Sequence, residues 1–238
     1  MHGEVNGEQS IDIEDYDTKG GMLVGFLEKL KDTLKTGNQD LGIPVLDPLQ
    51  KEHVNVDLNA KGVIELKGAL DNFRVHGLSS YTVNQGDFKL AGFLANISLT
   101  WNEIDLMTKY NVNGKLADLI SIYGDGIIMV QGKDLTVKVD VKLSINDERK
   151  LYVKNLSLHV HLKQLQFQIT GLNNDAELSK LVSSIVSDIT PQLIEDYQEQ
   201  LSQTVSPLVI NELNQLLKDM TLDKLIDIIT GKSSPALS

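Results

Sequence analysis

Two histidines separated by a single residue, His159 and His161, have the spacing best suited to chemistry. In an extended strand, residues i and i+2 point to the same face, so both imidazoles could ligate one metal ion. Leu158, Val160 and Leu162 alternate with them, however, and this pattern assigns the buried face to the aliphatic residues. We therefore expect both histidines to face water. No third ligand follows nearby, and we expect no metal site.

The other motifs that carry catalysis do not occur in the sequence. Gly124-Asp125-Gly126 is not followed by the rest of a phosphate-binding fingerprint or by a helical pattern. There is no G-x-S-x-G, no H-E-x-x-H and no acidic calcium loop, and the 33 Asp and Glu residues are scattered. The chain has no cysteine, which excludes thiol catalysis, disulfides and cysteine-bound zinc. We expect a protein that is not an enzyme, with no catalytic residues and no cofactor.

Composition and charge narrow the class of partner. The chain has 238 residues, is 41% hydrophobic and carries a net charge of −11. An acidic surface argues against binding to nucleic acid or to anionic membranes. No run of about 18 apolar residues occurs, so we expect no integral membrane segment. A hydrophobic small molecule or lipid remains the partner that fits best.

The N-terminal residues bear on localisation. Residues 1–19 are polar and acidic and predict a flexible segment. No signal peptide is visible, and we interpret the chain as a secreted, extracellular protein whose signal has been removed, with Met1 added for expression. Two candidate glycosylation sequons, Asn96-Ile97-Ser98 and Asn155-Leu156-Ser157, weakly favour secretion.

Long runs of alternating apolar and polar residues fill the region from Val54 to Ile169. Such alternation predicts strands with one buried face and one wet face. A strand over 151–169 would reach roughly 60 Å, since each residue adds about 3.3 Å. Strands of this length must curl strongly, and a curled sheet needs something to wrap around.

The alternation changes phase at three places. Phe88 is apolar at an even position whereas Phe93 is apolar at an odd one, and Gly92 lies between them. A second change lies near Asn155, and a third between Leu162 and Leu165. A β-bulge shifts the register by one residue, so we predict a bulge at Gly92 and another at Asn155, each bending the sheet.

Apolar residues repeat at helical spacing near both ends of the chain. The first run comprises Leu23, Phe26, Leu27, Leu30 and Leu34, and Gly37 follows as a natural C-cap. After Gly171 apolar residues repeat at helical spacing as far as Ile229. We expect Pro191 to kink or restart the long helical region and Pro207 to interrupt it again.

This order of elements predicts an α+β fold. It is a long, highly curved antiparallel sheet wrapped around a long amphipathic helix, with further C-terminal helices, and not a βαβ alternation. Residues 20–230 are expected to form a single lipid-binding-like domain. Residues 231–238 are expected to be a polar tail.

Four short motifs resemble the takeout and haemolymph juvenile-hormone-binding proteins of insects. The first two are Asp47-Pro48-Leu49 and Val75-His76-Gly77-Leu78-Ser79. The others are Tyr110-Asn111-Val112-Asn113-Gly114-Lys115 and Tyr123-Gly124-Asp125-Gly126. Their order and spacing carry the resemblance, which spans residues 20–220. The sequence is also similar to the group-seven mite allergens.

The resemblance implies a tubular lipid-binding fold, related to the modules of bactericidal/permeability-increasing protein, in which a curved sheet wraps a long helix. It also implies secretion and carriage of a hydrophobic ligand in a tunnel. This chain lacks the usual N-terminal cysteine pair and the pattern usual in the C-terminal third. These departures favour the cysteine-free mite allergen branch or a divergent insect relative.

Our leading hypothesis is a non-enzymatic carrier that binds a hydrophobic, lipid-like ligand in an elongated apolar tunnel. The residues expected to line it are Leu23, Phe26, Leu27, Leu30, Val56, Leu66, Phe88, Phe93, Trp101, Tyr110, Phe167 and Ile185. The same residues would equally suit a filled core. The alternative is therefore an immune or surface-active interaction protein, allergen-like, with no transported ligand.

Overall fold

A single antiparallel sheet of six strands dominates the computed structural model, which describes residues 21, 23–39, 43–60, 64–116 and 118–231. The strand order is β1-β2-β4-β5-β6, and β3 pairs with β4 beyond the end of β2. The bounds are β1 Leu49–Ala60, β2 Ile64–His76, β3 Thr82–Lys89, β4 Leu94–Leu116, β5 Ile120–Ile145 and β6 Leu151–Ile169. The predicted N-terminal segment, residues 1–19, lies outside the described residues, as do residues 232–238 of the polar tail.

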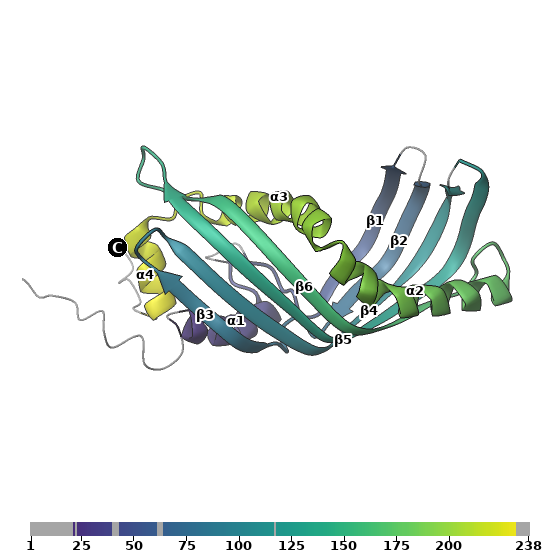
Figure 1. Ribbon diagram of the computed structural model, residues 1–238, viewed down its shortest axis with the longest axis horizontal. Helices are drawn as coiled ribbons and strands as arrows, with labels where there is room; N and C mark the ends of the chain where they lie inside the picture. The colour runs from purple at the N-terminus through teal and green to yellow at the C-terminus, as the bar shows by residue number, and fades with distance from the viewer. Residues whose placement is uncertain (1–20, 22, 40–42, 61–63, 117, 232–238) are drawn as a thin grey trace, which may run out of the picture.

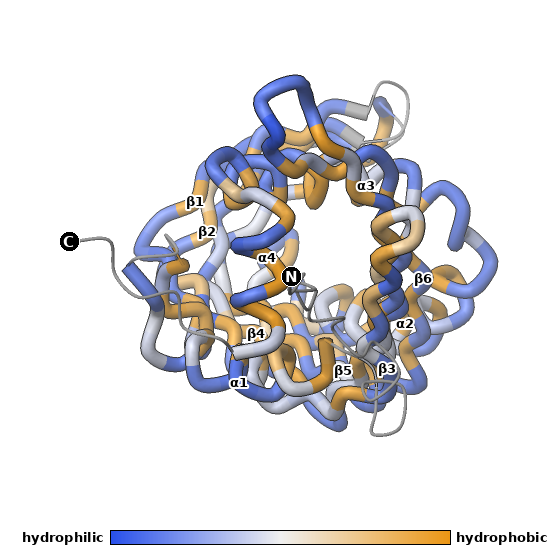
Figure 2. The backbone as a smooth tube through the Cα atoms, turned by 90° about the vertical axis from the view of Figure 1, so that its left-hand side faces the viewer, coloured by the Kyte–Doolittle hydropathy of each residue, from blue (hydrophilic) through white to orange (hydrophobic). Residues whose placement is uncertain are grey.

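Four helices complete the fold: α1 Val24–Thr36, α2 Ala176–Asp196, α3 Gln198–Leu216 and α4 Leu222–Thr230. The sheet curls into an open trough, with α2 and α3 running along one side and α1 and α4 at one end (Figure 1). Seen from that end, the backbone forms a ring in which apolar and polar residues alternate along the strands (Figure 2). The predicted α+β class with a long curved antiparallel sheet is confirmed.

Glycines at two crowded positions let neighbouring strands approach closely as the sheet curls. Gly68 in β2 has φ +155°, and a Cβ there would lie 2.0 Å from the carbonyl oxygen of Asn111. A Cβ on Gly114 in β4 would lie 1.8 Å from the carbonyl oxygen of Glu65. Any larger residue would force the paired backbones apart, so both positions require glycine.

The buried face of β4 changes from odd-numbered residues, up to Trp101, to even-numbered residues from Ile104 onward. Trp101 pairs with Leu135 and Glu103 with Lys133, whereas Asp134, between Lys133 and Leu135, has φ +50° and pairs with no residue of β4 or β6. The Asp134 carboxylate instead accepts a hydrogen bond from the Lys163 ammonium at 2.9 Å. The predicted change of phase between Leu162 and Leu165 thus lies opposite the irregular backbone at Asp134. We refer to the parts of the trough on either side of this irregularity as its two halves.

The two predicted bulges had different outcomes. Lys142 pairs with Asn155 while Leu143 pairs with Val153, so Lys154 is an extra residue and the bulge near Asn155 is confirmed. The bulge at Gly92 is wrong, because Gly92 lies in the turn between β3 and β4. Gly92 has φ +86°, a conformation that glycine adopts readily in turns. A reversal of the chain therefore produced the phase change there.

The prolines of the long helical region do not end helices. Pro191 lies inside α2 and Pro207 inside α3, and the break falls at Tyr197, whose φ of −114° and ψ of 28° are not helical. The expectation that Pro207 interrupts the helix is therefore wrong. A proline removes one backbone hydrogen bond, and helices that are docked along their length can tolerate that loss.

A row of polar side chains from α2 and α3 caps the free edge of β6. The hydroxyl oxygen of Ser183 accepts from the Ile169 N–H at 3.0 Å, and that of Ser187 accepts from the Phe167 N–H at 2.8 Å. Four more backbone N–H groups donate to side-chain oxygens in this row: Leu172 to Ser179, Val160 to Gln198, Leu158 to Ser202 and Val153 to Asn214. These bonds satisfy backbone donors that would otherwise be left open at the edge of the sheet.

Candidate ligand-binding cavity

An apolar cavity of about 250 Å³ lies at the end of the trough that holds α1 and α4. Helices and strands from both ends of the chain contribute to its wall. The lining residues are Leu23, Phe26, Ile43, Phe88, Ala95, Ile97, Val141, Leu143, Val153, Leu213, Leu216, Leu217, Met220, Leu225 and Ile228. None of these side chains carries a hydroxyl, amide or charged group. The cavity is therefore suited to a hydrocarbon and would leave a polar group without a partner.

Phe26 of helix α1 and Leu23, which directly precedes this helix, line the cavity, and two hydrogen bonds fix this segment to the sheet. The Leu23 N–H donates to the Gly86 carbonyl at 2.8 Å, and the Tyr81 hydroxyl donates to the Leu27 carbonyl at 2.6 Å. Burial, together with the charge of Glu28, raises the pKa of Tyr81 to about 12. The phenol therefore stays neutral and able to donate at physiological pH.

Trp101 packs against Tyr81 and against the core next to the cavity. The two rings meet edge to face, with centroids 5.5 Å apart. The indole N–H of Trp101 donates to the Leu78 carbonyl at 3.0 Å. Both aromatic residues thus have their polar atoms paired with the backbone, and they present ring carbon to the core.

The C-terminal helices cover the cavity from the other side. The Leu151 N–H, at the start of β6, donates to the Met220 carbonyl at 2.8 Å. Thr221 caps the first turn of α4, and Gly231 ends it in the left-handed conformation. These contacts place Leu225 and Ile228 against residues from the opposite end of the sequence.

The twelve predicted lining residues fall into four groups. Three of them line the cavity: Leu23, Phe26 and Phe88. Four belong to the same core without bordering the cavity: Leu27, Leu30, Phe93 and Trp101. Four strand residues lie in the other half of the trough: Val56, Leu66, Tyr110 and Phe167. Ile185 lies on α2 and is 46% exposed.

Tyr110 in particular is a structural residue of the wall. It is 2% exposed, and its hydroxyl donates to the Thr170 carbonyl at 2.7 Å. This bond ties β4 to the segment that leads into α2. Burial raises the pKa of Tyr110, as does the nearby charge of Asp125, so the phenol keeps its proton for this bond.

Sequence reasoning missed most of the cavity wall. The missed residues are Ile43, Ala95, Ile97, Val141, Leu143, Val153, Leu213, Leu216, Leu217, Met220, Leu225 and Ile228. Many of them stand in the alternating or helical runs and so were recognisable as buried. What the pattern lacked was any sign that the end of the chain folds back onto its beginning.

The comparison with family models decides the classification. The model described as haemolymph juvenile hormone binding protein (JHBP) matches residues 15–227. The chain belongs to this family. The resemblance that the four short motifs carry is thereby confirmed, and two of those motifs meet in space, since the Asp47 carboxylate accepts from the N–H groups of Gly77 and Ser79.

A solved structure shows the same fold. The crystal structure of Epiphyas postvittana Takeout 1 matches with a TM-score of 0.60 and 17% identity, over 84% of this chain and 93% of that chain. A crystal structure of lipopolysaccharide binding protein matches with a TM-score of 0.36 and 14% identity, over 79% of this chain and 39% of that chain. No curated protein matches the chain by sequence.

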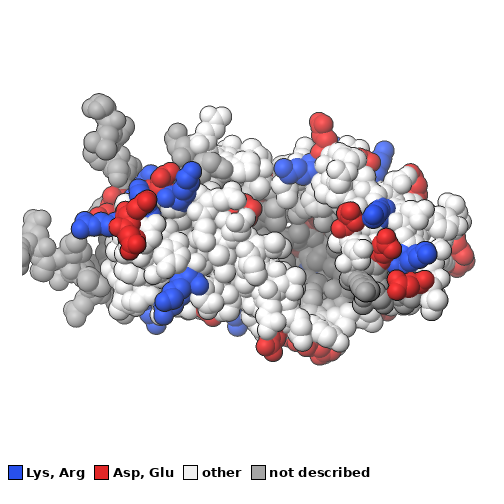
Figure 3. Space-filling view, turned by 90° about the horizontal axis from the view of Figure 1, so that it is seen from above, with Lys and Arg blue, Asp and Glu red and all other residues white. Residues whose placement is uncertain are grey.

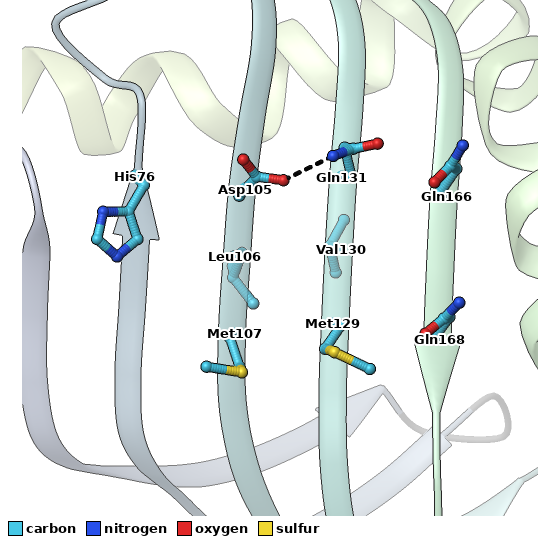
Figure 4. A pocket seen from close by; sticks show the side chains of 9 residues that line it. All are labelled: His76, Asp105, Leu106, Met107, Met129, Val130, Gln131, Gln166 and Gln168. Carbon is cyan, nitrogen blue, oxygen red and sulfur yellow. Dashed lines mark hydrogen bonds between the residues drawn. The ribbon is translucent and has the colours of Figure 1, made fainter.

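Another pocket, with a volume of about 340 Å³, lies on the outer face of the sheet. Figure 4 shows Asp105, Gln131, Gln166 and other side chains on that face, whereas Leu106 and Val130 lie behind their strands. The Gln131 amide donates to Asp105 at 3.0 Å. Met107 and Met129 are 48% and 38% exposed, and polar side chains such as Asp105 and Gln131 share the lining, so this pocket suits a hydrocarbon less well than the end cavity does.

The paired histidines are exposed on β6. His161 bonds through Nδ1 to the carboxylate of Glu195 on α2, and the structure shows no such partner for His159. Within the described residues, no three His, Asp or Glu side chains gather in a way that would hold a metal ion. No helix in the described part of the chain is long and apolar enough to span a membrane.

Proposed function

We propose that this protein is a secreted, non-enzymatic carrier that binds the hydrocarbon part of a lipid-like ligand in the end cavity. The observation that carries the proposal is the lining, which consists entirely of apolar side chains drawn from α1, the sheet, α3 and α4. Family membership supports it, because the family is described by the binding of a hormone in haemolymph.

The physical basis of binding is the removal of apolar surface from water. Each Å² buried contributes about 25 cal/mol, from which the costs of association are subtracted. Because the lining has no polar side chain, a carboxyl or hydroxyl group would lose its hydration there without a replacement. The ligand is therefore expected to keep its polar end outside the cavity, toward the open trough.

The rival hypothesis was an interaction protein with a filled core. The cavity counts against it, because a filled core leaves no space of this size among its side chains. The open side of the trough is also hollowed midway along the molecule, and it carries few charged side chains there (Figure 3). Both features suit access of an apolar molecule to the interior.

Filling the cavity should test the proposal. Ala95 is 8% exposed and lines the cavity, whereas Ala91 is exposed in the turn between β3 and β4. We predict that Ala95→Leu weakens the binding of a fluorescent fatty acid about tenfold, which corresponds to about 1.4 kcal/mol. The larger side chain would occupy space that the acyl chain needs.

Ala91→Leu is the matched control, because it makes the same chemical change outside the cavity. Fluorescence titration gives the dissociation constant of each variant, and thermal unfolding checks that both fold. Equal affinities for the two folded variants, or no binding of any acyl probe by the parent protein, would refute the cavity as the binding site.

A further inference from the structure

The two glycosylation sequons lie in very different surroundings. Asn155 and Ser157 are both exposed on β6, at the bulge created by Lys154. Neither side chain bonds to any residue that the structure describes. The acceptor amide and the hydroxyl two residues later are therefore both free on the surface, as a bulky N-linked glycan requires.

The other sequon is enclosed within the sheet. Asn96 on β4 pairs with Asp87 of β3 on one side and with Asp140 of β5 on the other. Its amide nitrogen already donates to the Asp140 carboxylate at 2.5 Å. The hydroxyl-bearing Ser98 is 5% exposed. Attachment of a glycan to Asn96 would weaken this cross-strand bond.

We propose that Asn155 carries an N-linked glycan and that Asn96 remains unmodified. In the reaction, the side-chain nitrogen of Asn155 forms a bond to the anomeric carbon of a lipid-pyrophosphate-linked oligosaccharide. The bond from that carbon to the pyrophosphate oxygen breaks, the lipid pyrophosphate leaves, and the amide nitrogen loses one proton. The proposal rests on secretion, which is part of the proposed function, because the donor is encountered on the secretory route.

The glycan would not obstruct the cavity. Val153 and Leu156 of the same strand are buried in the core, and Val153 lines the cavity, whereas Asn155 faces solvent. The edge of β6 at this level is already occupied by α3, through the bonds from the Val153 N–H to Asn214 and from the Leu158 N–H to Ser202. A glycan on Asn155 thus projects outward from the sheet, and ligand affinity should not depend on it.

The test is expression of the full chain in eukaryotic cells behind a cleavable signal peptide. Intact mass is measured before and after treatment with an N-glycosidase. The parent protein, Asn96→Gln and Ser157→Thr should each lose the mass of one glycan, whereas Asn155→Gln and Ser157→Ala should show none to lose. Peptide mapping of the parent, in which the glycosidase converts the occupied Asn to Asp, identifies the site without any substitution.

A secreted parent protein without a glycan, or one whose glycan maps to Asn96, would overturn the proposal. Binding of a fluorescent fatty acid is measured on the same samples. A chain that binds the probe but has no glycan on Asn155 contradicts only this inference. A chain glycosylated on Asn155 that binds no acyl probe contradicts only the proposed carrier function.

Discussion

Asp47 shows how one side chain joins two segments that are about thirty residues apart. Its carboxylate accepts hydrogen bonds from the Gly77 N–H at 3.0 Å, the Ser79 N–H at 2.9 Å and the Ser79 hydroxyl at 2.5 Å. Burial alone would raise the pKa of Asp47. The bonds from Ser79 and Gly77, with the charge of His76, outweigh burial and lower that pKa below its ordinary value.

We predict that Asp47→Asn lowers the free energy of unfolding at neutral pH by about 1–3 kcal/mol, since buried donors lose a charged acceptor. Because the pKa is depressed in the folded state, ionised Asp47 stabilises the fold above its ordinary pKa. That contribution is lost as the pH falls below about 4. Parent and variant should therefore differ in urea midpoint at pH 7 and converge in acid.

Asp57→Asn is the control for this prediction, because Asp57 is exposed on β1 and removal of its charge should have little effect. A constant difference between Asp47→Asn and the parent from neutral pH into strong acid would show that the ionised carboxylate is not responsible. So would equal stability of the two Asp→Asn variants.

At the level of elements, the serines of α2 hold the helix to the edge of β6. We predict that the double variant Ser183→Ala, Ser187→Ala lowers the free energy of unfolding by about 2–5 kcal/mol, because two edge N–H groups lose their acceptors. The amide hydrogens of Ile169 and Phe167 should also exchange with solvent much faster. Urea unfolding and hydrogen exchange measure the two effects.

Ser184→Ala is the matched control, since Ser184 is exposed on the same helix. It makes the same Ser→Ala change once on this helix, without removing a bond to the sheet. If the double variant exchanged and unfolded like this control, the serine row would not be what docks α2.

The sequence predicted the elements well wherever a local pattern determines them. Helix α1 follows from the spacing of its leucines and ends before Gly37, and the bulge near Asn155 follows from one extra residue in the alternation. The prediction at Gly92 was wrong because a turn between two strands shifts the apolar alternation just as a bulge would. The prediction at Pro207 was wrong because a helix that is docked along its length can continue through a proline.

The cavity was harder to predict, because its wall depends on contacts between distant segments. Leu213 and Leu217 were visible as one face of a helix, and Ala95 and Val141 as one face of two strands. Periodicity identifies such faces as buried but does not say which faces meet. Phe167 and Ile185 were assigned to the same tunnel for that reason, although neither borders the cavity.

As a whole, the molecule is a trough whose two halves differ. The half with α1 and α4 contains the packed core, and the cavity lies within that half. In the other half, apolar side chains remain open to solvent, including Leu58 at 52% exposure. A carrier needs an enclosed apolar site and a way into it, and this division of the trough is consistent with both requirements.

Photoaffinity labelling tests the central claim most directly. A fatty acid with a photoreactive group near the end of its chain is bound, irradiated and mapped by peptide mass spectrometry. If the end cavity holds the ligand, labels should fall on cavity residues such as Val153, Leu213 and Leu217. Excess unlabelled fatty acid and the Ala95→Leu substitution should each suppress this labelling. Specific labelling confined to the outer-face pocket around Met107 and Met129, or no competable labelling at all, would contradict this claim.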